Sequence, residues 1–243
     1  MNVNMKENEN KTLTVLVTGA NRGIGLALTR HYLSQGHKVF CTCREAHRES
    51  LLTQLTRHVD TSKLNIITVD LAEPVCESAF ALVADNSLDL LINNAAMGDA
   101  GAEFKYETMQ SEAWLQAFRV NVIAPLELTR MLLPKFSPSG TAVMISSHLA
   151  SISLNDSPDS VLYGATKAAL NSAVHRLSLS PLFFDISLGL IHPSSVQTRL
   201  SGFNGMSPEH SAALIAQTCH RFIKRELTSG SFVDARSGEL LPW

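Results

Sequence analysis

Apolar and polar positions follow two different periods along this chain. Short, almost continuous apolar runs are typical of strands buried on both faces of a sheet, whereas apolar residues three and four positions apart are typical of amphipathic helices. The short runs predict strands at residues 13–19, 37–43, 64–71, 88–96, 140–147, 186–196 and 230–235. The helical pattern predicts helices at residues 23–36, 77–86, 111–133, 160–180 and 208–227, with a further helical segment after the second strand.

This alternation predicts an α/β fold: a single-domain, doubly wound parallel sheet of the Rossmann type with helices on both faces. No internal repeat, low-complexity tract or linker interrupts it, so residues 12–243 are expected to form one domain. Residues 1–11 are polar and lack the apolar core of a signal peptide, and we expect a flexible leader there.

Composition excludes several function classes. The net charge is -2 and no block of lysine or arginine is present, which argues against nucleic acid or a membrane surface as a partner. No apolar run approaches the roughly 18 residues of a membrane span. Cys41 and Cys43 would share one face of a strand, and without a second Cys/His pair or an HExxH motif we expect buried thiols and no metal. A cytoplasmic protein fits best.

A glycine-rich turn follows the first predicted strand, with Gly19, Gly23 and Gly25 in the segment "GANRGIG". Such a turn lets a ligand approach the backbone, and the free N–H groups of the next helix attract a phosphate. A P-loop would need Gly-Lys-Ser/Thr, and no lysine is present. The spacing also departs from the Gly-x-Gly-x-x-Gly fingerprint. NAD, NADP and a purely structural turn remain as alternatives.

Tyr163 and Lys167 are four residues apart, so on a helix they lie on one face. A tyrosine can supply the proton that a carbonyl oxygen needs after hydride transfer, although its ordinary pKa of about 10 must then be lowered. A neighbouring ammonium group would lower it. Ser147 ends the fifth predicted strand, where doubly wound sheets bind ligands. Asn121 lies within a predicted helix, where a solvated and a functional asparagine are both possible.

The segments "TGANRGIG", "NNAA" (93–96), "VNV" around Asn121, "ISS" (145–147) and "YGATK" (163–167) occur in this order. Together they resemble the short-chain dehydrogenase/reductase family over nearly the whole chain. The segments "CTCRE", "KAALN", "HPSSVQT" and "SGSFVDARSGELLPW" are similar to its C-factor/sniffer-like carbonyl reductase branch. The resemblance implies an oxidoreductase that interconverts a small-molecule carbonyl compound and its alcohol by hydride transfer.

The resemblance also implies a role for each site residue. Tyr163 is the acid/base, Lys167 lowers its pKa and binds ribose, Ser147 rather than Ser146 orients the carbonyl, and Asn121 holds a water of the proton relay. The cofactor-binding residues are expected to be Gly19, Asn21, Arg22, Gly23, Ile24, Gly25, Arg44, Asp70, Leu71, Asn94, Ala95, Tyr163, Lys167, Pro193, Val196 and Thr198.

Two arginines decide between the cofactors. An acidic residue after the second strand would bind the 2′-hydroxyl of NAD, but Arg44 lies at about that point and Arg22 lies in the glycine turn. Guanidinium groups form charge-assisted hydrogen bonds with a phosphate. We therefore predict NADP(H) rather than NAD(H). Glu45 keeps NAD as the alternative, because a shift of one residue would place an acid there.

Two positions depart from the family pattern: Ala96 and Ser194 stand where glycine is usual. Each adds a Cβ near the cofactor, and we interpret both as tuning. Residues 199–207 are expected to form a substrate flap, and His148 and His192 to shape the substrate pocket. A homodimer or homotetramer paired through the long helices is expected. The alternative function is a C-factor-like signalling or redox-sensing protein that binds the dinucleotide with little turnover.

Overall fold

A parallel sheet forms the centre of the molecule in a computed structural model, which describes residues 11–98, 106–198 and 203–243. Within them, seven strands pair in the order β3-β2-β1-β4-β5-β6-β7, and every pairing is parallel. The predicted doubly wound α/β fold is confirmed. The strands are β1 Thr14–Val17, β2 Lys38–Cys43, β3 Leu64–Thr68, β4 Leu88–Asn93, β5 Phe136–Ile145, β6 Ser187–His192 and β7 Ser231–Asp234.

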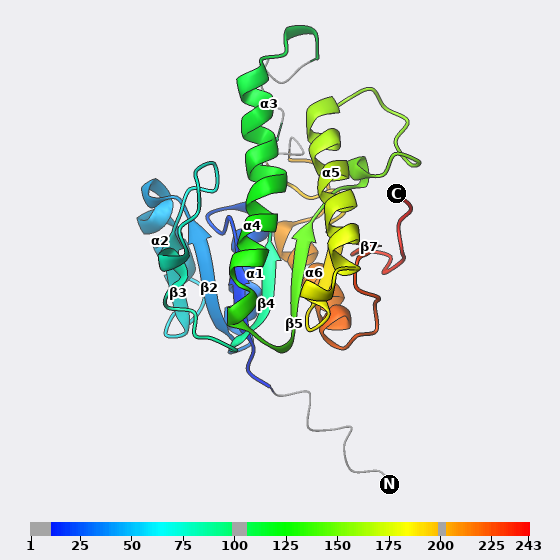
Figure 1. The fold of residues 1–243 in the computed structure, drawn as a ribbon. Helices are drawn as coiled ribbons and strands as arrows, with labels where there is room; N and C mark the ends of the chain where they lie inside the picture. Colours follow the sequence, from blue (N-terminus) through cyan, green and yellow to red (C-terminus); the bar gives the residue numbers. More distant parts are fainter. Residues whose placement is uncertain (1–10, 99–105, 199–202) are drawn as a thin grey trace.

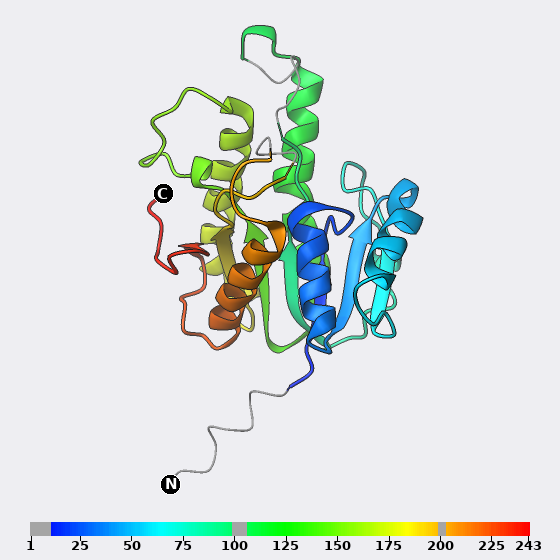
Figure 2. The same cartoon turned by 180° about the vertical axis from the view of Figure 1, so that it is seen from behind.

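Helices cover both faces of this sheet. They are α1 Gly23–Ser34, α2 Arg48–Thr56, α3 Ser111–Phe118, α4 Ala124–Met131, α5 Val161–Ser178 and α6 Pro208–Ile223. Figure 1 shows α3, α4 and α5 in front of the sheet, and Figure 2, from behind, shows α1 and α6 on the other face. Among the described residues, none of the helices is both long and apolar enough to cross a membrane.

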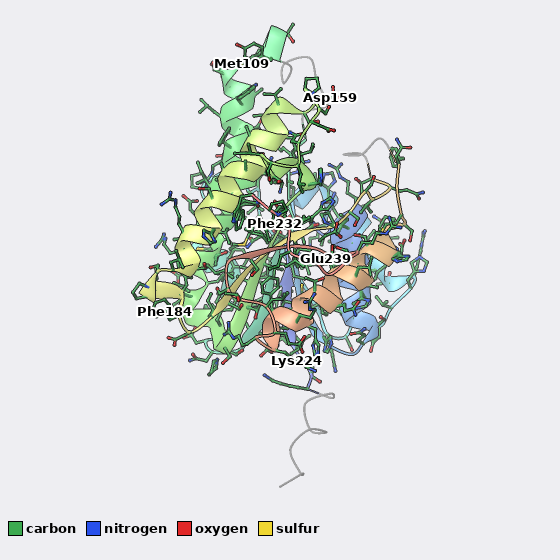
Figure 3. The ribbon with its side chains drawn as sticks, turned by 90° about the vertical axis from the view of Figure 1, so that its right-hand side faces the viewer. Met109, Asp159, Phe184, Lys224, Phe232 and Glu239 are labelled. Carbon is green, nitrogen blue, oxygen red and sulfur yellow. The ribbon has the colours of Figure 1, made fainter. Side chains whose placement is uncertain are left out.

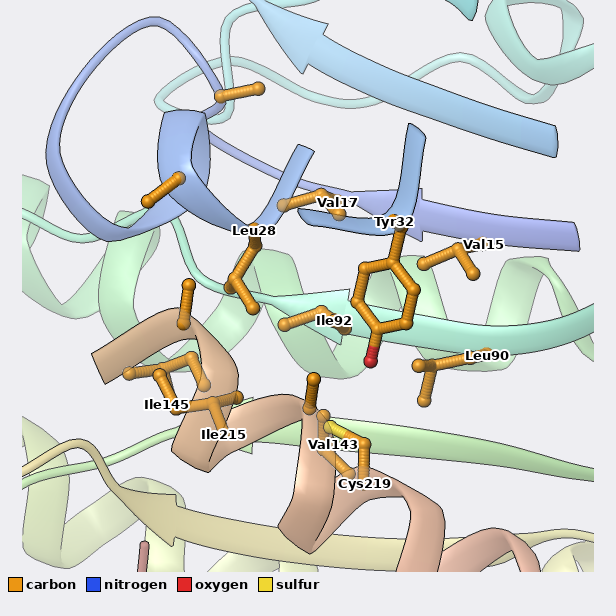
Figure 4. Packing of buried hydrophobic residues seen from close by; sticks show 14 of the residues in the cluster. Val15, Val17, Leu28, Tyr32, Leu90, Ile92, Val143, Ile145, Ile215 and Cys219 are labelled. Atoms are coloured by element: carbon orange, nitrogen blue, oxygen red, sulfur yellow. The ribbon is translucent and has the colours of Figure 1, made fainter. Parts of the chain in front are cut away.

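Alternate strand residues build two separate cores. Val15 and Val17 pack on the side of α1 and α6, whereas Leu16 between them packs on the side of α4 and α5. Figure 4 shows the first core, in which Tyr32 points from α1 toward Cys219 of α6. Nearly continuous apolar runs are therefore required, because both faces of each central strand are buried.

The sheet order places a crevice at one end of the strands. The connections from β1 and from β4 leave toward opposite halves of the sheet, and such a switch point opens a crevice at the carboxyl ends of the strands. The helix α3 extends beyond this end (Figure 1). Seen from the side in Figure 3, Met109 and Asp159 mark the carboxyl end, and Phe184 and Lys224 mark the opposite end.

Three predictions of secondary structure need correction. Residues 77–86 form only a short 3-10 turn, Glu77–Phe80 (η2), because just Phe80 and Val83 are buried in this segment, too few for the apolar stripe of an amphipathic helix. The helix predicted at 111–133 is divided by a π-helical turn, Arg119–Ile123 (η5). The sixth strand ends at His192, since Pro193 has no N–H for the ladder.

The predicted leader falls almost wholly outside the described residues. Its last residue, Lys11, is described, and its ammonium lies 2.9 Å from a carboxylate oxygen of Asp89. Asp89 also accepts a hydrogen bond from the backbone N–H of Thr14 at 2.9 Å. These contacts join Lys11 to the beginning of β1 and β4.

Candidate active site

A cavity of about 910 Å³ opens at the carboxyl ends of the strands. Its walls come from the turn between β1 and α1, the ends of β2 to β5, the first turns of α5 and the loop after β6. The cavity lies where the sheet order predicts a ligand. Its volume is large enough for a cofactor together with a small substrate.

The glycine turn forms one wall of this cavity. Gly19 and Gly23 have φ values of +67° and +54°, the left-handed region that glycine adopts without strain. A Cβ on Gly19 would lie 2.9 Å from the Cα of Ala95, and one on Gly25 would collide with the carbonyl of Gly19. The turn therefore needs glycine for two reasons, its backbone conformation and the close approach of neighbouring backbone.

Asn94 fixes this turn against the end of β4. Its side-chain amide donates to the carbonyl oxygen of Thr18 at 2.9 Å and to that of Gly19 at 3.3 Å. In return, the Thr18 hydroxyl accepts from the backbone N–H groups of Asn94 and Ala95 at 2.9 and 3.0 Å. Thr18 was not predicted as a site residue, although its place directly before Gly19 was a usable signal.

Positive charge gathers at the β2 end of the cavity. Arg22 and Arg44 both line it, and both side chains are exposed. A guanidinium nitrogen of Arg44 lies 3.3 Å from the Nε2 of His47. Glu45 is absent from the described residues that line the cavity, so the arginine rather than the acid faces it. Asp70 lines it too, and its carboxylate accepts from the backbone N–H of Ala72 at 3.0 Å.

Lys167 occupies the other end of the cavity. Its side chain is only 2% exposed, and its ammonium donates to the carbonyl oxygen of Ile145 at 2.7 Å. Burial lowers the pKa of Lys167 from its ordinary value of 10.5 to about 8, so it stays mostly protonated at pH 7. The ammonium lies 5.6 Å from the centre of the Tyr163 ring, and both residues stand on α5. The predicted pair is thus on one face of one helix.

The two serines after β5 both belong to the cavity wall, but they differ in burial and in hydrogen bonding. The Ser146 hydroxyl is buried and donates to the side-chain oxygen of Asn171 at 2.6 Å, which makes it part of the packing beneath α5. Ser147, two residues past the end of the strand, is half-buried and lines the cavity. Its hydroxyl oxygen accepts from the backbone N–H of Leu149 at 3.2 Å. Because the oxygen is the acceptor in this contact, the O–H of Ser147 can donate a hydrogen bond to a ligand.

Asn121 lies behind the cavity wall, in the π-helical turn η5. The side chain is 1% exposed, so it is not a solvated helix residue. Its oxygen accepts from the backbone N–H of Met97 at 2.7 Å, and its nitrogen donates to the Met97 carbonyl at 2.9 Å and to the Thr166 hydroxyl at 3.0 Å. Asn121 therefore joins the loop after β4 to the helix that carries Tyr163 and Lys167.

The loop after β6 closes the remaining side. Pro193, Val196 and Thr198 line the cavity. Ser194 has φ of +64°, a conformation that glycine adopts more readily, which explains why the related pattern has glycine there. Its hydroxyl donates to a carboxylate oxygen of Asp234 at 3.4 Å. Of the predicted flap, residues 199–202 lie outside the described part of the chain.

Most of the predicted site residues meet in this one cavity. Its walls include Gly19, Asn21, Arg22, Gly23, Ile24, Arg44, Asp70, Leu71, Asn94, Ala95, Ser147, Tyr163, Lys167, Pro193, Val196 and Thr198. Gly25 and Asn121 stand behind the wall and support it. Sequence reasoning missed Met97, Gln116, Val120 and Leu149, which line the cavity from the loops and α3–η5. For Gln116 and Val120 the sequence held a usable signal, because their four-residue spacing places both on one face of a helix.

These residues fit a dinucleotide. A Cβ on Gly19 or Gly25 would fill the bend of the turn, and the first turn of α1 carries no acidic side chain that would repel a phosphate. Arginines stand at one end of the cavity and Lys167 at the other. Fold and cavity together define a Rossmann-type protein with a dinucleotide site.

Comparisons with known proteins extend this assignment. The family model described as short chain dehydrogenase matches residues 13–206, so the chain belongs to the short-chain dehydrogenase/reductase family of oxidoreductases. It is 30% identical to the short-chain dehydrogenase RED3 of Pyricularia oryzae, over 96% of this chain and 99% of that protein.

Solved carbonyl reductases have a similar structure. The chain is 32% identical to a carbonyl reductase of Pseudomonas aeruginosa in complex with NADP, with a TM-score of 0.82, and covers 100% of it with 96% of its own length. It is 26% identical to the carbonyl reductase Sniffer of D. melanogaster, with a TM-score of 0.81 and the same coverage. These similarities support a nicotinamide dinucleotide as cofactor and agree with the predicted carbonyl reductase branch.

Proposed function

We propose that the protein is an NADPH-dependent carbonyl reductase that reversibly converts a carbonyl compound to its alcohol. The observation that supports this most strongly is that Ser147, Tyr163 and Lys167 line one end of the cavity whose other end carries Arg22 and Arg44. Reacting groups and phosphate-binding groups thus stand at opposite ends of one site, as a long dinucleotide requires.

Each residue has a defined task in this reaction. The nicotinamide, when bound, supplies a hydride to the carbonyl carbon. The Ser147 hydroxyl, fixed by the Leu149 N–H, donates a hydrogen bond to the carbonyl oxygen. Tyr163 gives that oxygen its proton, so the carbonyl gains one hydride and one proton and becomes an alcohol. The ammonium of Lys167, buried beside the Tyr163 ring, stabilises the phenolate that remains.

The cofactor has its own set of residues. Arg22 and Arg44 would bind the 2′-phosphate, Asp70 the adenine, and Lys167 the nicotinamide ribose. The N–H groups at the beginning of α1 would bind the pyrophosphate. Pro193, Val196 and Thr198 would border the nicotinamide. Asn121 would support the proton relay through the position it gives to α5.

The test is NADPH oxidation by the purified protein with a panel of aldehydes, ketones and quinones. We expect turnover with members of the panel and a fall in kcat of about a hundredfold or more for Tyr163→Phe, because one general acid contributes roughly 10² to 10⁴ in rate. NADPH binding, followed by cofactor fluorescence, should survive that change. Binding without oxidation across the whole panel would contradict the proposal.

A further inference from the structure

The turn that carries Ser147 depends on an acceptor from a neighbouring strand. Residues His148–Ala150 form a 3-10 turn (η7) whose first N–H groups need acceptors outside the ordinary ladder. The Ala150 N–H makes the turn's own bond, to the Ser147 carbonyl at 2.9 Å, so the N–H groups that need other acceptors are those of His148 and Leu149. The Leu149 N–H donates to the Ser147 hydroxyl at 3.2 Å. The remaining one, from His148, donates to the Nδ1 of His192 at 3.0 Å.

The way the sheet ends explains why a side chain, rather than a backbone carbonyl, accepts the hydrogen bond from the His148 N–H. The β5–β6 ladder runs in register to Ile145 and Ile191, and the Ser146 N–H still donates to the Ile191 carbonyl at 2.8 Å. The ladder stops there because Pro193 has no N–H. The imidazole of His192 then makes one more connection between the two chain segments, beyond the last backbone bond.

We propose that His192 is a positioning residue for Ser147. Its Nδ1 accepts a hydrogen bond from the His148 N–H, and this bond fixes the turn that follows Ser147. In that turn the Leu149 N–H orients the Ser147 hydroxyl toward the carbonyl of the substrate. This inference rests on the proposed function, because it gives His192 its effect through Ser147. It assigns no proton transfer to His192.

The protonation state of His192 agrees with this role. Nδ1 accepts a hydrogen bond only when it carries no proton, so the neutral ring must bear its proton on Nε2. Burial, the largest influence, lowers the pKa of His192 to about 4; the carboxylate of Asp234 on β7 raises it and the His148 ring lowers it. The ring therefore stays neutral, and the contact stays intact, throughout the ordinary pH range.

Three substitutions at His192 separate positioning from packing. His192→Leu removes the acceptor, His192→Asn places an amide oxygen where Nδ1 stood, and His192→Gln moves that oxygen to the place of Nε2. We expect His192→Leu and His192→Gln to lower kcat by roughly ten- to a hundredfold, as a small misplacement of a catalytic group does. His192→Asn should keep most of the wild-type kcat. In all three variants the NADPH dissociation constant should stay within about twofold of the wild-type value.

Two controls accompany these variants. His58→Leu changes an exposed histidine that is not among the described cavity residues, and it should leave kcat and binding unchanged. In a Ser147→Ala background, His192→Leu should cause little further loss, because both changes remove the same interaction. Full kcat in His192→Leu, equal kcat in the Asn and Gln variants, or fully additive losses with Ser147→Ala would each overturn the proposal.

A readout independent of turnover separates this inference from the proposed function. Nitrogen-15 NMR of the imidazoles in the wild-type protein should show His192 as the neutral Nε2–H form at neutral pH, with Nδ1 accepting a bond that His192→Leu abolishes. An Nδ1–H form would overturn the positioning role even in an active enzyme. A wild-type protein with the expected tautomer but without carbonyl reduction would instead contradict the proposed function.

Discussion

Lys167 shows how burial sets the properties of a single site residue. Its ammonium is enclosed by the end of β5 and by α5, and it donates a hydrogen bond to a neutral carbonyl, that of Ile145, rather than to a carboxylate. The fold thus keeps a cation in a poorly hydrated place, which costs free energy in the protein without cofactor. The same charge is what the proposed mechanism needs beside Tyr163.

This cost predicts a dependence of stability on pH. Between about pH 8, the pKa in the folded protein, and 10.5, the ordinary value of an unfolded chain, the unfolded state binds more protons. The free energy of unfolding therefore rises with pH across this window, by about 3 kcal/mol from Lys167 alone. Urea unfolding without NADP(H) should show that wild type gains this amount relative to Lys167→Met. A difference between the two proteins that does not change with pH would contradict the prediction.

Two short segments determine the shape of the site at the level of secondary structure. The glycine turn lets the backbone bend tightly between β1 and α1, and Asn94 ties it to β4. The π-helical turn η5 lies between α3 and α4, and its Asn121 joins the loop after β4 to α5. Both segments depart from regular structure where the cavity needs support, which is common at functional sites.

The glycine turn gives a second prediction, for Gly25→Ala. The added Cβ would collide with the Gly19 carbonyl and lie close to the side chain of Asn94, so the turn must move. We expect a loss of about 1–3 kcal/mol in the free energy of unfolding, together with weaker NADPH binding.

Gly36→Ala is the matched control for this change. Gly36 also has a positive φ, of +78°, but a Cβ there would meet no atom within 4 Å, and it lies after α1, away from the cavity. It should cost stability through its backbone conformation and leave NADPH binding unchanged. Equal effects of the two variants on binding would show that the turn has no special role.

At the scale of the whole molecule, the sheet order brings distant segments to one crevice. Arg22 follows β1, Arg44 follows β2 and Lys167 lies on α5, yet all three line the same cavity. The arginines stand at its exposed end and the lysine at its buried end. Under the proposed function, this arrangement would place the phosphate of the adenosine at the arginine end and the reaction at the lysine end.

That placement predicts the cofactor preference. Replacing Arg22 and Arg44 together by alanine should weaken NADPH binding by at least about tenfold and leave NADH binding nearly unchanged, because only NADPH carries the 2′-phosphate that charge-assisted bonds would hold. Fluorescence titration with each cofactor measures both constants. Arg57→Ala, at an exposed arginine outside the described cavity wall, is the control. Equal losses for NADPH and NADH would show that the arginines do not select the phosphate.

Much of this protein was predictable from its sequence, because the decisive signals are local. Continuous apolar runs identify buried strands, "GANRGIG" requires a bend that only glycine permits, and the spacing of Tyr163 and Lys167 places both on one helix face. The homodimer or homotetramer, by contrast, stays a prediction. The helix predicted at residues 77–86 was wrong, because the apolar Leu82 is exposed and the segment buries no continuous helical face.

Tertiary structure alone decided which polar groups support the site and which face it. Ser146 and Ser147 are neighbours of the same type, and their physical difference lies in tertiary contacts: Ser146 is buried against Asn171, whereas Ser147 is half-buried and accepts from the Leu149 N–H. The hydrogen bond from the His148 N–H to His192 joins residues 44 positions apart, and no pattern in the sequence indicates it. The reason is physical: a periodic pattern records which face of an element is buried, whereas the partner of a buried polar group depends on how separate elements meet.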